Sequence, residues 1–84
     1  MSRKKFNVTN NLDNYINIEI GKRMIENGVK VRKADIMEEI AEFSNVGVYN
    51  IAMIKRNAVT PSLPVAMKIA EYFNTSVENL FRIS

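Results

Sequence analysis

The segment 40–61, IAEFSNVGVYNIAMIKRNAVTP, constrains the fold most, because it has helical apolar spacing on both sides of a short break. Apolar residues three and four positions apart lie on one face of a helix. That spacing ends near Phe43 and resumes with Ile51 and Ile54. Residues 44–47, SNVG, include Ser, Asn and Gly, which favour turns. The segment therefore predicts two short helices joined by a turn of about four residues.

The rest of the chain continues the helical spacing and predicts three more helices, so that the expected class is all-α. The stretch 29–33, VKVRK, alternates like a strand but is short and isolated, so we interpret it as a connection and expect no sheet. The predicted helices span about 12–27, 33–43, 48–56, 63–73 and 77–81. One core is expected to contain Ile20, Met24, Ile36, Ile40, Ile51, Ile54, Ile69, Ala70, Phe73 and Leu80, with Phe43 and Leu63 also facing inward.

Positive charge is concentrated in the N-terminal part of the chain. Residues 1–33 contain eight Lys or Arg against three acids, whereas residues 34–84 contain four against six. Residues 1–11 have no helical spacing, so we expect a flexible basic arm there, followed by one domain at 12–84. A basic arm can neutralise DNA phosphates without reading sequence. A solvated terminus with no binding role is the alternative.

The composition also excludes several kinds of chemistry. The chain has no Cys and no His, the residues that supply disulfides, most zinc ligands, thiol nucleophiles and imidazole bases. We therefore expect no enzyme, cofactor or metal site, and interpret Glu38, Glu39 and Glu42 as a solvated helix face. No apolar run could span a membrane or act as a signal peptide, so we expect a cytoplasmic protein without membrane contact.

Several motifs resemble those of the lambda repressor-like, Cro/CI-type helix-turn-helix family. Residues 61–63, PSL, and 67–81, MKIAEYFNTSVENLF, are similar to its PSL start, KIA core and final S-x-x-x-LF. Residues 40–41 resemble its Leu-Ala pair, and residues 20–23 resemble the start of its first helix. The resemblance covers about 12–81. It implies a compact five-helix domain that binds DNA as a repressor-type transcriptional regulator, of phage, plasmid or mobile-element origin.

The second helix of such a motif enters the DNA major groove, where Asn reads adenine and apolar side chains contact the thymine methyl group. Four residues on the outer side of the predicted third helix are therefore candidate base readers: Val48, Tyr49, Asn50 and Met53. Basic and amide side chains in the arm and at helix ends are candidate contacts to the DNA backbone: Arg3, Lys4, Lys5, Lys33, Lys55, Arg56 and Asn57.

Two functions stay open on this basis. Where the family commonly has Arg, Gln or Ser, the third helix offers Val, Tyr and Met, which are also typical of protein-binding surfaces. The alternative is therefore a protein of the same fold that binds another protein, such as an antirepressor. On palindromic DNA the domain is expected to be a dimer. Phe81 and Ile83 either form a homodimer contact or close the core beside Leu12 or Tyr15.

Overall fold

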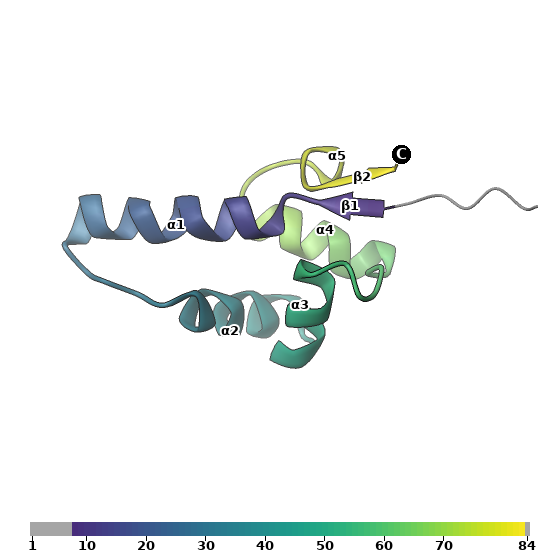
Figure 1. Cartoon of the computed structure of the whole chain (residues 1–84), viewed down its shortest axis with the longest axis horizontal. Coiled ribbons are helices and arrows are strands. Elements are labelled where there is room, and N and C mark those ends of the chain that lie inside the picture. Colours follow the sequence, from purple (N-terminus) through teal and green to yellow (C-terminus); the bar gives the residue numbers. More distant parts are fainter. Residues whose placement is uncertain (1–7, 84) are drawn as a thin grey trace, which may run out of the picture.

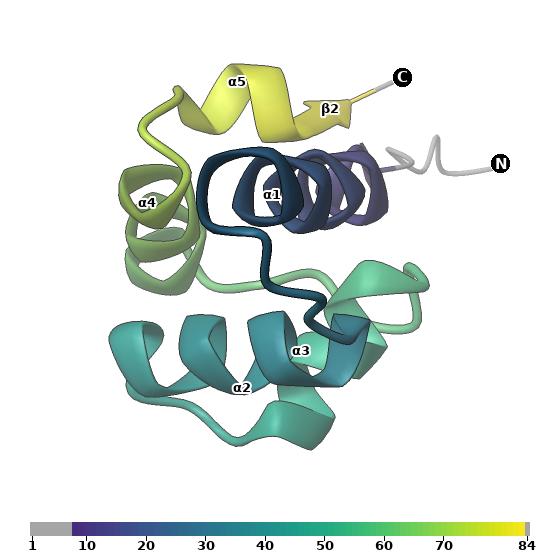
Figure 2. The same ribbon diagram turned by 90° about the vertical axis from the view of Figure 1, so that its left-hand side faces the viewer.

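Five helices and two short strands make up residues 8–83, the part of the chain that the computed structural model describes. The mostly helical fold that the apolar spacing predicts is confirmed. α1 crosses above α2 and α3, while α4 and α5 cover other sides of α1 (Figures 1 and 2). In chain order the elements are β1 (Val8–Asn10), α1 (Leu12–Asn27), α2 (Lys33–Ser44), α3 (Val48–Lys55), α4 (Leu63–Tyr72), α5 (Val77–Leu80) and β2 (Phe81–Ile83).

The prediction that the fold contains no sheet is wrong. β1 and β2 pair antiparallel, with Val8 opposite Ile83 and Asn10 opposite Phe81. The strand places residues 8–10 of the expected arm in the domain, while residues 1–7 lie outside the described residues. Strands of three residues are too short to show alternation, so the sequence pattern could not reveal them. The stretch 29–32 is a connection, as expected.

Local sequence signals set the helix ends. α1 ends at Gly28, which has φ 65°, a left-handed conformation that costs glycine little. α2 ends at Asn45 with φ 59°, a left-handed conformation that Asn adopts more readily than most residues. The Ser76 side chain caps α5 by accepting a hydrogen bond from the Asn79 N–H at 3.1 Å. Ser62 directly precedes α4, although no described backbone N–H donates to its hydroxyl.

One apolar core lies where the helices meet. Leu12 and Ile16 of α1 join it, while Ile20 and Phe73 are half-buried at its edge. Buried apolar side chains exclude water from the space between the helices, which is the main favourable term in folding. Most of the predicted core residues are buried, namely Ile36, Ile40, Ile51, Ile54, Ile69, Ala70 and Leu80.

Three residues that were predicted to face inward lie at the surface. Met24 is 47% exposed, because α1 has 16 residues and its last turns extend beyond α2 (Figure 1). Phe43 lies near the end of α2, where its ring packs edge-on against Tyr72 with centroids 5.8 Å apart. Leu63 is the first residue of α4 and lines a surface depression with Met67. Helical spacing predicts the side of a helix on which a residue lies, but it does not predict whether another helix covers that side.

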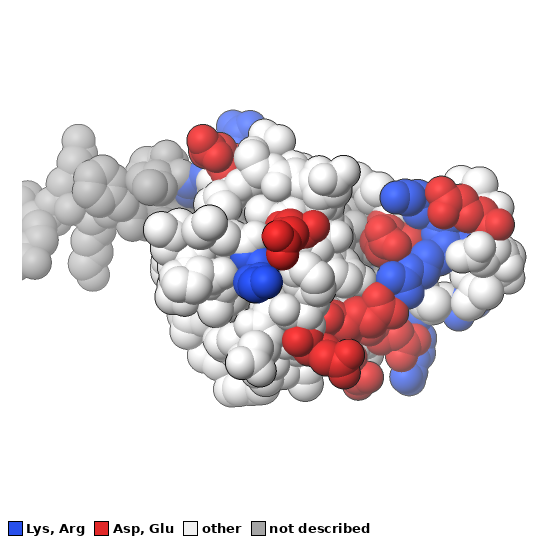
Figure 3. Space-filling view, turned by 180° about the vertical axis from the view of Figure 1, so that it is seen from behind, with Lys and Arg blue, Asp and Glu red and all other residues white. Residues whose placement is uncertain are grey.

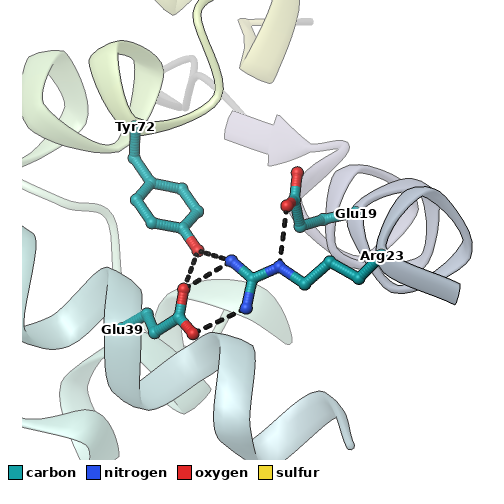
Figure 4. Close-up of polar contacts among 4 residues, drawn as sticks. All are labelled: Glu19, Arg23, Glu39 and Tyr72. Carbon is teal, nitrogen blue, oxygen red and sulfur yellow. Dashed lines mark hydrogen bonds and ion pairs between the residues drawn. The ribbon is translucent and has the colours of Figure 1, made fainter. Parts of the chain in front are cut away.

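A polar network fixes α2 against α1 and α4 (Figure 4). Arg23 of α1 donates two hydrogen bonds to Glu39 of α2, from Nη1 to Oε2 at 2.7 Å and from Nη2 to Oε1 at 2.6 Å. Its Nε donates to Glu19 Oε2 at 3.0 Å, and the Tyr72 hydroxyl of α4 donates to Glu39 Oε1 at 2.7 Å. The paired bonds set the orientation of both side chains. Because α3 follows α2 after three residues, the network also helps to place α3.

The network predicts how stability depends on pH. Hydrogen bonds from Arg23 hold the pKa of Glu39 below its ordinary value of 4.5. A carboxylate with a depressed pKa stabilises the fold above its unfolded pKa and loses that contribution as the pH falls through its folded pKa. Wild type should therefore lose more thermal stability than Glu39→Gln between about pH 6 and about pH 3, as measured by circular dichroism.

Glu42→Gln is the matched control for this measurement. It makes the same change of charge on the same helix but lies outside the Arg23 network. It should lose stability in parallel with wild type as the pH falls. Parallel curves for wild type and Glu39→Gln would show that the network contributes no pH-dependent stability.

Candidate nucleic-acid interface

α2 and α3 are joined by three residues, Asn45–Gly47. The Val46 N–H donates to the Ala41 carbonyl at 3.0 Å, and the Val46 side chain is half-buried against the core. The Gly47 carbonyl accepts from the Ile51 N–H at 3.2 Å, which begins α3. The turn therefore separates two helices that both pack on the same core.

The outer, solvent-facing side of α3 can be located from the residues that the helix buries. Ile51 and Ile54 are buried, and with about 100° between successive residues Tyr49 lies roughly opposite them. Tyr49 is 70% exposed and Val48 is 43% exposed, as expected for candidate readers. Asn50 and Met53 are half-buried, so they are less accessible than predicted. Neither Tyr49 nor Asn50 makes a side-chain hydrogen bond to another described residue.

Sequence reasoning missed one residue of this outer side. Ala52 lies three positions after Tyr49 and is half-buried. The signal was present in the helical spacing, but a small apolar residue offers no hydrogen bond that marks it as a reader.

The candidate phosphate contacts differ in their surroundings. Arg56 is exposed just after α3, and it makes no ion pair with another residue of the described part of the chain. Lys33 and Lys55 both contact Asp13 of α1, with Nζ to Oδ1 distances of 2.9 Å and 3.6 Å. These two lysines are therefore paired within the protein. Arg3, Lys4 and Lys5 lie outside the described residues.

Asn10 ties β1 to the end of α3, a connection that sequence reasoning did not reveal. Its Nδ2 donates to the Ile54 carbonyl and to Asn57 Oδ1, both at 2.8 Å. Its Oδ1 accepts from the Leu12 N–H at 2.9 Å at the start of α1. The candidate contact Asn57 has φ 63°, and its side-chain oxygen is used by Asn10. The Asn57 amide nitrogen is the group that could still donate to a phosphate.

α3 has no acidic residue of its own, although Asp13 of α1 lies 3.6 Å from Lys55 at its end. Residues 43–70, which include all of α3 and most of α4, contain no Asp or Glu. Four acids of α2 line a separate depression of about 300 Å³: Asp35, Glu38, Glu39 and Glu42. Figure 3 shows acidic side chains gathered with basic ones at the lower right of one face, beside a broad area that carries one neighbouring basic and acidic pair. Within 8–83, no group of three His, Cys, Asp or Glu could hold a metal ion.

The predicted homodimer contact is only partly described. Phe81 is half-buried and packs against the core, while its backbone lies opposite Asn10 in the sheet. This arrangement agrees with the alternative in which Phe81 closes the core. The Ile83 side chain lies outside the described residues, although its backbone pairs with Val8. A homodimer through these two residues stays a prediction.

Comparison of the chain with models of known protein families and with curated proteins finds no match. Among the described residues, no helix has the length and apolar character needed to cross a membrane.

Proposed function

We propose that this protein is a sequence-specific DNA-binding regulator of repressor type, in which α2, the turn and α3 form a helix-turn-helix. The observation that carries the proposal is the exposed outer side of α3, which lies in an acid-free stretch and ends at Lys55 and Arg56. DNA is polyanionic, so a recognition surface needs cations near it and few competing carboxylates. The resemblance to Cro/CI-type domains supports the same function.

Each side chain then has a definite role on DNA. Asn50 would pair its amide with an adenine edge, and Val48 would contact a thymine methyl group. Tyr49 would reach a phosphate or a base edge. Lys33, Lys55, Arg56, Asn57 and the arm residues Arg3, Lys4 and Lys5 would contact the backbone and fix the register without reading sequence.

Two copies would bind a palindromic operator in the cytoplasm. One short recognition helix covers only a few base pairs, and two-fold symmetry doubles the contact surface. Phe81 and Ile83 are the proposed contact between the copies. Analytical ultracentrifugation should then find two copies on the operator, and a protein that stays monomeric with and without DNA would contradict the contact.

An electrophoretic mobility shift with the DNA upstream of the protein's own gene tests this function. The protein should retard that duplex more strongly than a random duplex of equal length, and retardation of both should weaken as the salt concentration rises. Equal retardation of both duplexes would contradict sequence-specific binding, and no retardation of either would contradict DNA binding.

A second candidate is an antirepressor-like protein that covers the DNA-reading surface of another regulator. The exposed Val48 and Tyr49 favour it, because apolar and Tyr side chains are common at protein interfaces. Under this alternative the chain binds no duplex itself but releases a repressor from its operator. Tyr49→Ala should then abolish that release.

A further inference from the structure

Three helices bring charged side chains together at Asp13. Asp13 lies in the first turn of α1, Lys33 is the first residue of α2, and Lys55 is the last residue of α3. Lys33 Nζ lies 2.9 Å from Asp13 Oδ1, and Lys55 Nζ lies 3.6 Å from the same oxygen. The sequence does not reveal this cluster, because it joins residues that are distant along the chain.

The cluster carries one positive charge in excess, since two ammonium groups share one carboxylate. The neighbouring lysines hold the pKa of Asp13 below its ordinary value, so the carboxylate is ionised at neutral pH. All three side chains are partly exposed to solvent. Ion pairs in such positions are weak, because water and salt screen them. Another anion could therefore replace the carboxylate.

A DNA backbone phosphate has the chemistry that fits this cluster. A phosphodiester carries one negative charge over two free oxygens, as an aspartate carboxylate does. Lys55 is followed directly by the exposed Arg56, and Asn57 is held beside them by Asn10. A phosphate at the two lysines would thus lie next to further donors at the end of α3.

We propose that Lys33 and Lys55 form one site for a DNA backbone phosphate, and that Asp13 occupies this site in the free protein. The inference rests on the proposed function and adds that Asp13 and a DNA phosphate compete for the two lysines. Displacing Asp13 costs the same free energy on every sequence, because the backbone phosphates of all duplexes are alike. Asp13 therefore weakens cognate and random binding by one common factor and leaves their ratio unchanged.

The test compares Asp13→Asn with Glu71→Gln on an operator duplex and on a random duplex. Both variants remove one negative charge, but Glu71 pairs with Lys68 on α4 at 3.5 Å and does not contact Lys33 or Lys55. Asp13→Asn should bind both duplexes about 2- to 25-fold more tightly than Glu71→Gln at low salt, which is the factor expected for two exposed ion pairs. The gain should shrink at high salt.

A second comparison tests whether the gain in DNA affinity depends on Lys33 and Lys55. In a protein that carries Lys33→Gln and Lys55→Gln, the further change Asp13→Asn should give no more affinity than Glu71→Gln does. A gain that persists without the lysines would overturn the proposal. Thermal unfolding at the assay temperature confirms that each variant is folded, because an acid in the first turn also stabilises α1.

The outcomes separate the inference from the proposed function. If wild type binds duplexes and Asp13→Asn binds no more tightly than Glu71→Gln, only the competition fails. If neither wild type nor any variant binds a duplex, the proposed function fails and the inference fails with it.

Discussion

Ile54→Ala should lower the free energy of unfolding by about 2 to 5 kcal/mol, because it leaves a cavity in the core. Ile54 is only 1% exposed and holds the inner side of α3 against the core. A domain of this size has about 5 to 15 kcal/mol of stability in total, so the variant should be largely unfolded at modest urea concentrations. Urea denaturation followed by circular dichroism measures the change.

Ile25→Ala is the matched control for the cavity. Ile25 lies on α1 and is 86% exposed, so its truncation should change the free energy of unfolding by less than about 0.5 kcal/mol. Wild-type stability of Ile54→Ala would contradict the arrangement of α3 on the core. A large loss from Ile25→Ala would instead show that the outer side of α1 is covered in solution.

Replacing Lys55 and Arg56 together by Gln should weaken binding to operator and random duplexes alike. The slope of log K against log salt is negative, and each lost phosphate contact reduces its magnitude by about 0.9, so losing both should make the slope less steep by about 2. Fluorescence anisotropy over a range of salt concentrations measures the slope. Lys22→Gln, on the exposed part of α1, changes the charge without removing a predicted contact and should keep the wild-type slope.

Asn50→Ala should weaken binding to the operator but not to random DNA. Loss of a bidentate adenine contact removes about 1 to 3 kcal/mol of discrimination at one or two base pairs and leaves random binding unchanged. Equal losses on operator and random duplexes would show that Asn50 does not read bases. For the double variant with Lys55 and Arg56 both replaced by Gln, unchanged affinity for random DNA would show that the end of α3 does not contact phosphates.

The helices could be predicted from the sequence because local residues determine them. Gly28 and Asn45 end their helices through left-handed backbone conformations, and Ser76 caps α5 with its own side chain. The buried side of α3 follows from the spacing of two isoleucines. The exposure of Met24 could not be predicted, because it depends on how far α1 extends beyond its neighbours.

The contacts around the candidate site were harder to predict, because they join distant residues. The hydrogen bond from Asn10 to the Ile54 carbonyl spans 44 positions. Lys33 and Lys55 were predicted from the sequence as contacts to the DNA backbone, but the sequence did not reveal their shared partner Asp13, which is 20 residues away from the nearer lysine. Helical periodicity places side chains on a face, whereas such pairs depend on how the helices are oriented to one another.

The most direct test of whether α3 contacts DNA is a nuclear magnetic resonance titration of the labelled protein with the upstream duplex. The largest changes in backbone amide shifts should occur at residues 47–50 and 55–57, with smaller changes on the acidic side of α2. Leu63 and Met67 on the exposed side of α4 serve as an internal comparison. Shifts concentrated at these two residues, with α3 unchanged, would contradict the proposed interface.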